Sequence, residues 1–316
     1  MRVRAIVNPR AGVAPTAARR AVEGGRPSWG DYAVVFTREA GHATGLAREA
    51  VGAGASLVIA VGGDGTINEV ARGLLGSGAA LGIVPVGSGN GLARALRLPL
   101  KPARALAALE TGVRRSIDVG RLNGGLFLNV AGTGFDAAVG AAFHRAGRDG
   151  SRRGLLSYLR LGVAEVFGYR PQPLVLEANG ERLGLTPFMV TFANGPQYGS
   201  GAVINPGGRL DDGRLEIVYF DCDGPFRHIL LAAPRLFTGG IERASRYRRL
   251  STAQATLRAE RPLVIHLDGD PVESAREIDL ELVPRALEVV VPADTAADPD
   301  GPFTPYVARD RVGVIE

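Results

Sequence analysis

Residues 57–76 of the chain read LVIAVGGDGTINEVARGLLG, and this stretch predicts the fold around it. An apolar run, Leu57 to Val61, ends in a glycine loop, after which apolar residues recur at the spacing of one helical face. Thr66 and Glu69 stand in the relation of a capping box, so we expect the helix to begin just after Thr66 and to stop at Gly76. A buried strand, a glycine loop and a helix N-terminus in this order direct backbone N–H groups at one spot, where an anion can bind.

The loop itself, Gly62-Gly63-Asp64-Gly65-Thr66, contains an acid. A carboxylate at an anion site makes sense if Mg²⁺ accompanies a phosphate. The alternative is a tight turn between strand and helix with an incidental acid. The local pattern favours the phosphate interpretation.

Composition narrows the class of protein. The chain has 316 residues, enough for two domains, and its 46% hydrophobic content excludes a disordered protein. The single cysteine, Cys222, excludes an intramolecular disulfide framework and fits a reducing compartment. Lys101 is the only lysine and lies outside a GxxxxGK[ST] motif, which excludes a Walker-type P-loop.

The formal net charge of +5 favours anionic partners such as a nucleotide or a phospholipid surface. The arginines are not interleaved with an aromatic platform, and Trp29 is the only tryptophan, so we expect no nucleic-acid binding. The sequence shows neither a signal peptide nor a run of about 18 apolar residues that would span a membrane. We therefore expect a cytoplasmic protein with at most peripheral membrane contact.

The first third of the chain alternates strands with helices, which predicts a parallel sheet covered on both faces. The expected strands are residues 3–7, 32–36, 57–61 and 81–86, and the expected helices are residues 16–23, 43–53, 92–96 and 102–109, besides the one after Thr66. Ligands of such sheets bind at the carboxyl ends of the strands. That edge gathers Asn8, Thr37, the Gly62–Thr66 loop and a second glycine loop, Gly87–Gly91.

After the expected helix at 102–109 the pattern changes to consecutive strands separated by glycine- and proline-rich turns, which predicts an antiparallel sandwich or barrel. The expected strands are residues 117–119, 126–130, 174–177, 188–193, 214–220, 263–267, 278–282 and 287–291, with helices at 154–167 and 226–237. We expect an α/β domain over residues 1–120, a β-sandwich domain over 121–291 and an irregular tail over 292–316.

Several motifs in order along the chain carry a resemblance. They are Asn8-Pro9, Thr37 before Gly41-His42-Ala43, GGDGTINEV (62–70), PVGSGNGLAR (85–94), Asp118, FLNVAGTGFDAAV (127–139), YGSG (198–201), DDGRLEIV (211–218) and HLDGD (266–270). The ordered set resembles the diacylglycerol kinase-like lipid kinases, in particular the soluble bacterial members, and it covers the chain to about residue 291.

The resemblance implies an ATP- and Mg²⁺-dependent lipid kinase with an NAD kinase-like α/β domain, a β-sandwich domain and an active site between them. The residues that it implies for ATP are Asn8, Thr37, Gly62, Gly63, Asp64, Gly65, Thr66, Asn68, Glu69 and Ser88. Asp64 and Asp118 match acids that organise the catalytic Mg²⁺, and Asp270 matches the proton acceptor. A second, structural Mg²⁺ is implied at the carboxylate of Asp212 and the backbone carbonyls of Arg209 and Arg214; the alternative there is an ordinary Asp-Gly hairpin.

Two positions depart from the family pattern. Gly91 stands where members usually have Asp, which removes an acid from the Mg²⁺-linked network. Asp270 stands where they usually have Glu, which shortens the reach of the base by one methylene. Activity is expected, and the two departures bear on rate and acceptor geometry.

Other interpretations stay open. NAD kinases also use a GGDG loop, inorganic phosphate donors such as polyphosphate are compatible with the sequence, and the two departures would also suit a weakly catalytic regulator that binds lipid or nucleotide. The AGTGFDA string (131–137) matches a dinucleotide motif but lies in the strand-rich half. The acceptor is expected to be diacylglycerol or a related lipid alcohol.

Two groups of arginines suggest contact with anionic membrane, although a solvated charged face explains them equally well. The first group surrounds the expected helix 154–167 and consists of Arg145, Arg148, Arg152, Arg153 and Arg160. The second group consists of Arg243, Arg246, Arg248 and Arg249. An exposed sheet edge could also pair two copies, so a homodimer is a further expectation.

Overall fold

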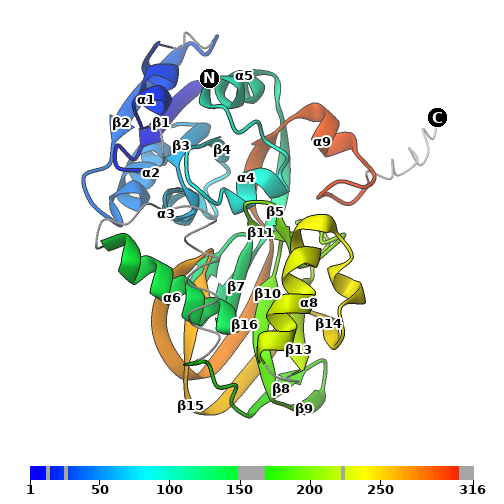
Figure 1. Cartoon of the computed structure of the whole chain (residues 1–316). Helices are drawn as coiled ribbons and strands as arrows, with labels where there is room; N and C mark the ends of the chain where they lie inside the picture. Colours follow the sequence, from blue (N-terminus) through cyan, green and yellow to red (C-terminus); the bar gives the residue numbers. More distant parts are fainter. Residues whose placement is uncertain (12–14, 25–27, 149–167, 222–224, 306–316) are drawn as a thin grey trace, which may run out of the picture.

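The computed structural model describes residues 1–11, 15–24, 28–148, 168–221 and 225–305. In the N-terminal half, four parallel strands lie in the order β2-β1-β3-β4, and helices alternate with them (Figure 1). The strands are β1 (Arg2–Val7), β2 (Asp31–Phe36), β3 (Leu57–Gly62) and β4 (Ala80–Pro85). The helices are α1 (Pro15–Gly24), α2 (His42–Gly52), α3 (Asp64–Leu74), α4 (Gly91–Ala95) and α5 (Pro102–Thr111).

Helices cover both faces of this sheet, as the alternating pattern predicts. Apolar residues of α2 and α3, such as Ala47 and Val70, pack on one face, and Val22 of α1 and Leu106 of α5 belong to the core on the other. The strands β3 and β4 are buried along their whole length, which explains why they read as continuous apolar runs rather than as alternating ones.

The start of α3 differs from the sequence expectation. The helix begins at Asp64, its N-cap is Gly63, and no side chain caps it, so Thr66 and Glu69 do not form a capping box. Both side chains have stronger tertiary partners, described below. The expected stop is confirmed, because α3 ends at Leu74 and Gly76 adopts a positive φ of 72° that favours glycine.

The C-terminal half is built of antiparallel strands. The order β14-β13-β10-β7-β15 joins β14 (Tyr247–Thr252), β13 (Leu215–Asp221), β10 (Pro187–Ala193), β7 (Val130–Gly134) and β15 (Gln254–Leu267). Shorter strands are β6 (Gly125–Phe127), β8 (Leu174–Ala178), β9 (Glu181–Leu185), β11 (Gln197–Gly199) and β12 (Ala202–Val203). The helices are α6 (Phe135–Arg148), which the sequence analysis missed, and α8 (Pro225–Thr238), which it predicted.

One long strand joins the two halves. The sequence suggested separate strands at 278–282 and 287–291, but β16 runs from Asp270 to Val291 as one element (Figure 1). It pairs with β15 near its start and in parallel with β4 at Glu288↔Ala80. From Leu280 to Val291 it also pairs with β5 (Val113–Leu122), and the register shifts between Val283 and Leu287. Arg285 (φ 48°) lies at this irregularity, between the two apolar segments that the sequence analysis took for separate strands.

The segment after Val291 was expected to be irregular, and this is correct only in part. A short helix, α9 (Ala293–Ala297), follows β16, and Phe303 beyond it is completely buried in the core of the N-terminal half. The expected helix 154–167 and Cys222 lie outside the described residues. Among the helices that are described, none is long and apolar enough to cross a bilayer.

Candidate active site

Two glycine loops meet at the carboxyl edge of the parallel sheet. A Cβ on Gly87 would lie 2.7 Å from the Cα of Gly63, so the loops touch backbone to backbone and leave no room for side chains. Asn8, at the end of β1, donates from Nδ2 to Thr66 Oγ1 over 3.0 Å, and the Thr37 amide donates to Val7 O over 2.9 Å. The sequence-predicted residues Asn8, Thr37 and Thr66 therefore lie at this edge, with both threonines buried.

Asp64 lies between the two loops. Its Oδ1 accepts a hydrogen bond from the Gly91 amide over 2.7 Å, which fastens the start of α3 to the start of α4. Burial, together with the negative charges of Asp268 and Asp270, raises the pKa of Asp64 to about 6. The backbone N–H groups of Gly91 and Asn90 act in the opposite direction.

Asp268 is a half-buried acid that the sequence analysis did not single out. Its Oδ1 accepts from the amides of Asn129 (2.9 Å) and Val130 (3.1 Å), and its Oδ2 accepts from the amide of Leu128 (2.9 Å) and from Asn68 Nδ2 (2.8 Å). Burial nevertheless raises its pKa. The local signal was only the Asp268-Gly269 pair, which by itself predicts a turn.

Asn68 links the two halves of the molecule. It was expected at the nucleotide phosphates, but its buried amide donates to Asp268 and to Leu126 O over 2.9 Å, both in the C-terminal half. The first turns of α3 are thereby held against the Leu267–Asp270 turn. Sequence spacing could not show this contact, because its partners are 200 residues apart.

Asp270, the expected proton acceptor, reaches the N-terminus of α3. A Cβ on Gly65 would lie 2.7 Å from Asp270 Oδ2, so the carboxylate rests directly against the glycine loop. The loop belongs to the N-terminal half and Asp270 begins β16, so folding brings the two expected site elements together. Asp64, Asp268 and Asp270 form what we call the acidic cluster.

Glu69 does not point at the loop. Its carboxylate accepts hydrogen bonds from the amides of Gly41 (2.8 Å) and Ala43 (3.1 Å) at the start of α2. Those amides have no partner within their own helix, so a neighbouring carboxylate satisfies them. This explains why Glu69 caps α2 rather than its own helix, and it leaves Glu69 without a place among the phosphate-facing groups.

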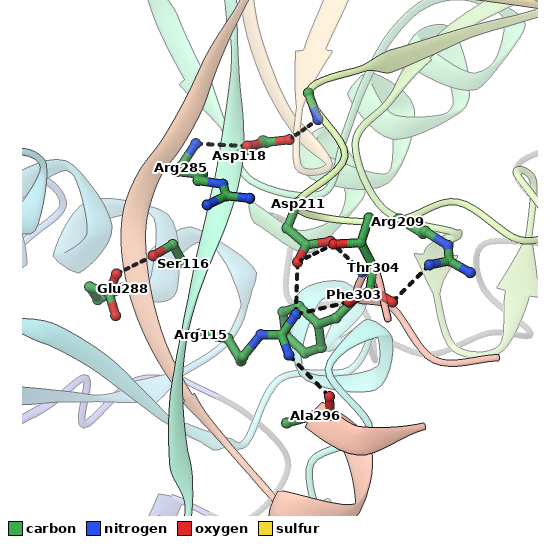
Figure 2. A network of polar contacts seen from close by, with 11 residues as sticks. Arg115, Ser116, Asp118, Arg209, Asp211, Arg285, Glu288, Ala296, Phe303 and Thr304 are labelled. Atoms are coloured by element: carbon green, nitrogen blue, oxygen red, sulfur yellow. Dashed lines mark hydrogen bonds and ion pairs between the residues drawn. The ribbon is translucent and has the colours of Figure 1, made fainter. Parts of the chain in front are cut away.

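Asp118 lies at a different place from the acidic cluster. Its carboxylate, completely buried, accepts hydrogen bonds from the amides of Gly213 and Arg285, each over 2.7 Å (Figure 2). Its negative charge acts on Asp212, whereas Asp64 is acted on by Asp268 and Asp270. Asp118 therefore anchors the Asp211–Gly213 turn to β16.

The residues expected around a structural metal meet at that turn. Asp212 Oδ1 accepts from the Arg214 amide over 3.1 Å, and burial with the charges of Glu216 and Asp118 raises the pKa of Asp212. The Arg209 side chain points away, donating to Phe303 O and Pro299 O over 3.1 Å each. In the described part of the chain, no three His, Cys, Asp or Glu side chains are arranged to hold a metal ion by themselves.

The C-terminal segment fastens the same turn, as Figure 2 shows. Asp211 accepts from the amide of Thr304 (2.6 Å) and pairs with Arg115 (2.9 Å), whose guanidinium lies 4.5 Å from the centre of the Phe303 ring. Leu210 donates to Pro302 O over 2.8 Å. We call residues 292–305 the C-terminal strap, because they hold the turn against the N-terminal half.

The departure at Gly91 has a structural reason. A Cβ there would lie 2.6 Å from both Asn129 Nδ2 and the backbone oxygen of Tyr198. Ser88, an expected nucleotide residue, accepts at its backbone oxygen from Ser200 Oγ over 3.2 Å. The second glycine loop is thus covered by the segment around Tyr198, which occupies the space of the missing acid.

Of the arginines expected at a membrane, the group around helix 154–167 lies largely outside the described residues. In the second group, Arg249 donates to Asn205 Oδ1 (3.3 Å) and Pro206 O (3.1 Å), and Arg248 lies 3.9 Å from Asp221. These two side chains therefore have partners within the protein.

Comparison with known proteins identifies the family of the chain. Residues 2–122 match the family model of the diacylglycerol kinase catalytic domain, and residues 129–291 match that of the YegS C-terminal NAD kinase beta sandwich-like domain. A probable lipid kinase YegS-like protein of Pseudomonas aeruginosa is 35% identical over 87% of this chain and 89% of its own length. One from Chromohalobacter salexigens is 34% identical over 88% of this chain and 89% of its own.

Solved structures share the fold. A putative diacylglycerol kinase from Bacillus anthracis superposes with a TM-score of 0.74 at 24% identity, covering 92% of this chain and 97% of that one. An NAD kinase from Archaeoglobus fulgidus in complex with ATP superposes with a TM-score of 0.51 at 14% identity, covering 93% and 95%. The family models and the curated relatives show that the chain belongs to the diacylglycerol kinase-like lipid kinases and is a lipid kinase.

Proposed function

We propose that the protein transfers the γ-phosphoryl group of ATP to a lipid hydroxyl in a Mg²⁺-dependent reaction, with diacylglycerol or a related lipid alcohol as acceptor. The observation that carries this proposal is the contact between Asp270 and Gly65, 2.7 Å from carboxylate oxygen to the position of an added Cβ. This observation supports the proposal because Asp270, the proposed proton acceptor, comes from one half of the chain and the helix N-terminus proposed to bind the phosphates comes from the other.

The triphosphate would bind at the start of α3. Backbone N–H groups of Gly63, Asp64 and Gly65 precede the first helical hydrogen bond, from the Ile67 amide to Gly63 O. Amides at this position lack helical partners, and the helix dipole favours negative charge there. Asn8, Thr37 and Thr66 border the same edge, and the Gly87–Gly91 loop closes it from the other side.

The acidic cluster fits a divalent cation. Asp64, Asp268 and Asp270 crowd negative charge beside the proposed polyphosphate site, and burial together with that crowding raises the pKa of Asp64 to about 6. Mg²⁺ in kinases is held by one or two carboxylates plus substrate phosphates, so three protein ligands are not required. Asp64 would hold it, and the ion would neutralise charge on the phosphoryl group. We propose that Asp118 acts through the Asp211–Gly213 turn, where Asp212 with the carbonyls of Arg209 and Arg214 would hold the structural ion.

Asp270 would act as the general base. Its carboxylate takes the proton of the lipid hydroxyl as that oxygen bonds to the γ-phosphorus, and the bond from phosphorus to the β–γ bridging oxygen breaks to release ADP. A positioned base contributes about 10² to 10⁴ in rate. The acceptor hydroxyl must then reach the contact between Asp270 and Gly65.

The test is transfer of label from γ-labelled ATP, with Mg²⁺, to a panel of lipid alcohols and NAD, with products identified by mass. We expect label in a lipid and not in NAD. Label in NAD alone would overturn the proposal. In a parallel assay with labelled polyphosphate, transfer to lipid from polyphosphate and none from ATP would overturn the choice of donor. Asp270→Asn should bind ATP normally and lose at least 10²-fold in kcat. Near-normal turnover in this variant would reject Asp270 as the base.

We also propose that the enzyme reaches its lipid by peripheral contact with anionic membrane, on the basic side of β14. Arg248 lies in β14 and Arg243 shortly before it, and both residues are exposed. Flotation with vesicles of increasing anionic lipid content should show increasing binding, and binding independent of that content would contradict the proposal.

The terminal strands β2 and β14 are edges at which two copies could pair, which light scattering would reveal.

A further inference from the structure

A cluster of buried and half-buried polar side chains in the C-terminal half has no place in the chemistry above. It consists of Asp136, Thr191, Tyr198 and His266, and we call it the Asp136 cluster. Asp136 Oδ2 lies within hydrogen-bond distance of Tyr198 Oη (3.1 Å), His266 Nε2 (3.3 Å) and Thr191 Oγ1 (3.4 Å), while Oδ1 accepts from the Ala137 amide (2.8 Å). Asp136, Thr191 and His266 are buried.

The histidine connects this cluster to the acidic cluster. His266 Nδ1 accepts a hydrogen bond from the Gly269 amide over 3.3 Å. Because Nδ1 is an acceptor, the neutral ring carries its proton on Nε2, which donates to Asp136. Asp136 thus determines which ring nitrogen faces the Asp268–Asp270 turn.

The turn needs such support. Asp268 (φ 49°) and Gly269 (φ 90°) are two successive residues in the left-handed region, which a non-glycine residue adopts rarely. The carboxylate of Asp268 is held by amides of residues 128–130, and the amide of Gly269 is held by His266. Asp270 follows at once, so the direction of its side chain depends on both attachments.

The other end of the Asp136 cluster reaches the second glycine loop. Tyr198 lies in β11, and Ser200 just after it donates from its amide to Gly89 O over 2.9 Å. Gly199 has a φ of 133°, and a Cβ on it would lie 3.1 Å from Gly89 O. Tyr198 also lines a small cavity of about 10 Å³ with Asp64 and Asp268. One connected path of contacts therefore runs from the Gly87–Gly91 loop through Tyr198, Asp136 and His266 to the turn.

We propose that His266 and Asp136 are positioning residues, which hold the Asp268–Asp270 turn so that Asp270 faces the start of α3. Tyr198 ties this support to the glycine loop that faces the nucleotide. The inference rests on the proposed role of Asp270 and adds the residues that set its geometry. None of them contacts the reacting atoms in this scheme.

Substitutions at His266 test the roles of its two ring nitrogens one at a time. The Oδ1 of Asn occupies about the place of Nδ1 and can still accept from Gly269, whereas the amide of Gln reaches the place of Nε2 and faces Asp136. We expect His266→Ala and His266→Gln to lower kcat about 10²-fold, the effect of a misplacement of about 1 Å, with KM for ATP within twofold. His266→Asn should recover to within about tenfold of wild type.

Asp136→Asn gives a second test. An amide has one oxygen, so it cannot accept both from Ala137 and from the Tyr198 and His266 donors on the other side. We expect the same loss of kcat as in His266→Ala. The matched control is Thr133→Val, which removes another buried hydroxyl of the same sheet, bonded to Val264 O over 2.7 Å and not to the turn. Its kcat should stay within twofold of wild type.

A readout independent of activity separates this inference from the proposed function. The chain has four histidines, so ¹⁵N spectra of their side chains can be assigned with the His266 variants. We expect His266 to show a protonated Nε2 that exchanges slowly and an unprotonated Nδ1. The other tautomer, a wild-type kcat in His266→Ala, or no advantage of Asn over Gln would overturn the inference. If the wild-type enzyme phosphorylates no lipid while the tautomer is as expected, the proposed function fails and the geometry stands.

Discussion

Replacing Phe303 by Ala tests whether the C-terminal strap is part of the folded core. The ring is completely buried among residues of the N-terminal half, and the Arg115 guanidinium lies 4.5 Å from its centre. Removing a buried Phe side chain costs about 3–5 kcal/mol, and the lost cation–π contact adds about 1 kcal/mol. We therefore expect Phe303→Ala to lower the free energy of unfolding by about 4–6 kcal/mol, a large part of the 5–15 kcal/mol typical of a domain.

The assay is urea unfolding followed by circular dichroism, with the midpoint compared at unchanged slope. Phe237→Ala is the matched control, because that ring is 43% exposed and its removal should cost about 1 kcal/mol. Phe303→Leu keeps most of the apolar volume and should lose less than about 2 kcal/mol. A loss at Phe303→Ala no greater than at Phe237→Ala would show that the strap is not docked, and the account of the Asp211–Gly213 turn would fail with it.

Three further predictions concern the site. Gly65→Ala should leave the free energy of unfolding unchanged or raise it by up to about 1 kcal/mol, because Ala favours the helix more than Gly does. Its kcat should fall about 10²-fold, because the added Cβ displaces Asp270. A kcat equal to that of wild type would contradict the contact between Gly65 and Asp270. Gly91→Asp should lower the melting temperature without raising kcat, because the added Cβ would collide with Asn129 Nδ2. A variant with higher kcat than wild type would refute this explanation of Gly91. Asp64 has a folded pKa of about 6, above the ordinary 3.8, so the metal-free folded protein binds more protons than the unfolded chain between those values. It therefore loses stability as pH rises through that window, by about 3 kcal/mol. Asp64→Asn should remove this loss, which urea unfolding of both proteins from pH 4 to 7 would measure; parallel curves would show that Asp64 is not perturbed.

Much of the N-terminal half was predictable because its signals are local. Buried parallel strands are apolar along their length, and helices show a 3.6-residue period, so the order of strands and helices follows from neighbouring residues. The glycine loops were also visible, since close backbone approach, as between Gly63 and Gly87, excludes any Cβ. The family motifs then placed Asp64 and Asp270 in one site.

Interactions between distant segments were not predictable in this way. The capping box at Thr66 and Glu69 failed because the orphan amides at the start of α2 attract the Glu69 carboxylate more effectively than its own helix does. Asp118 was expected to help organise the catalytic ion, and only the structure shows that its carboxylate accepts hydrogen bonds from the amides of Gly213 and Arg285. In each case the outcome depends on which unpaired backbone donor lies nearby after folding.

The sequence alone determined the class of fold, the phosphate-binding loops and the family, because glycine content, apolar period and motif order are properties of contiguous residues. Only the tertiary structure decided that β16 runs through both halves, that Asp268 is held by three backbone amides, and that Phe303 returns to the N-terminal core. Hydrogen bonds and buried contacts between residues far apart in the chain depend on the path of the folded backbone. The geometry of Asp270 against Gly65 is the consequence on which function depends.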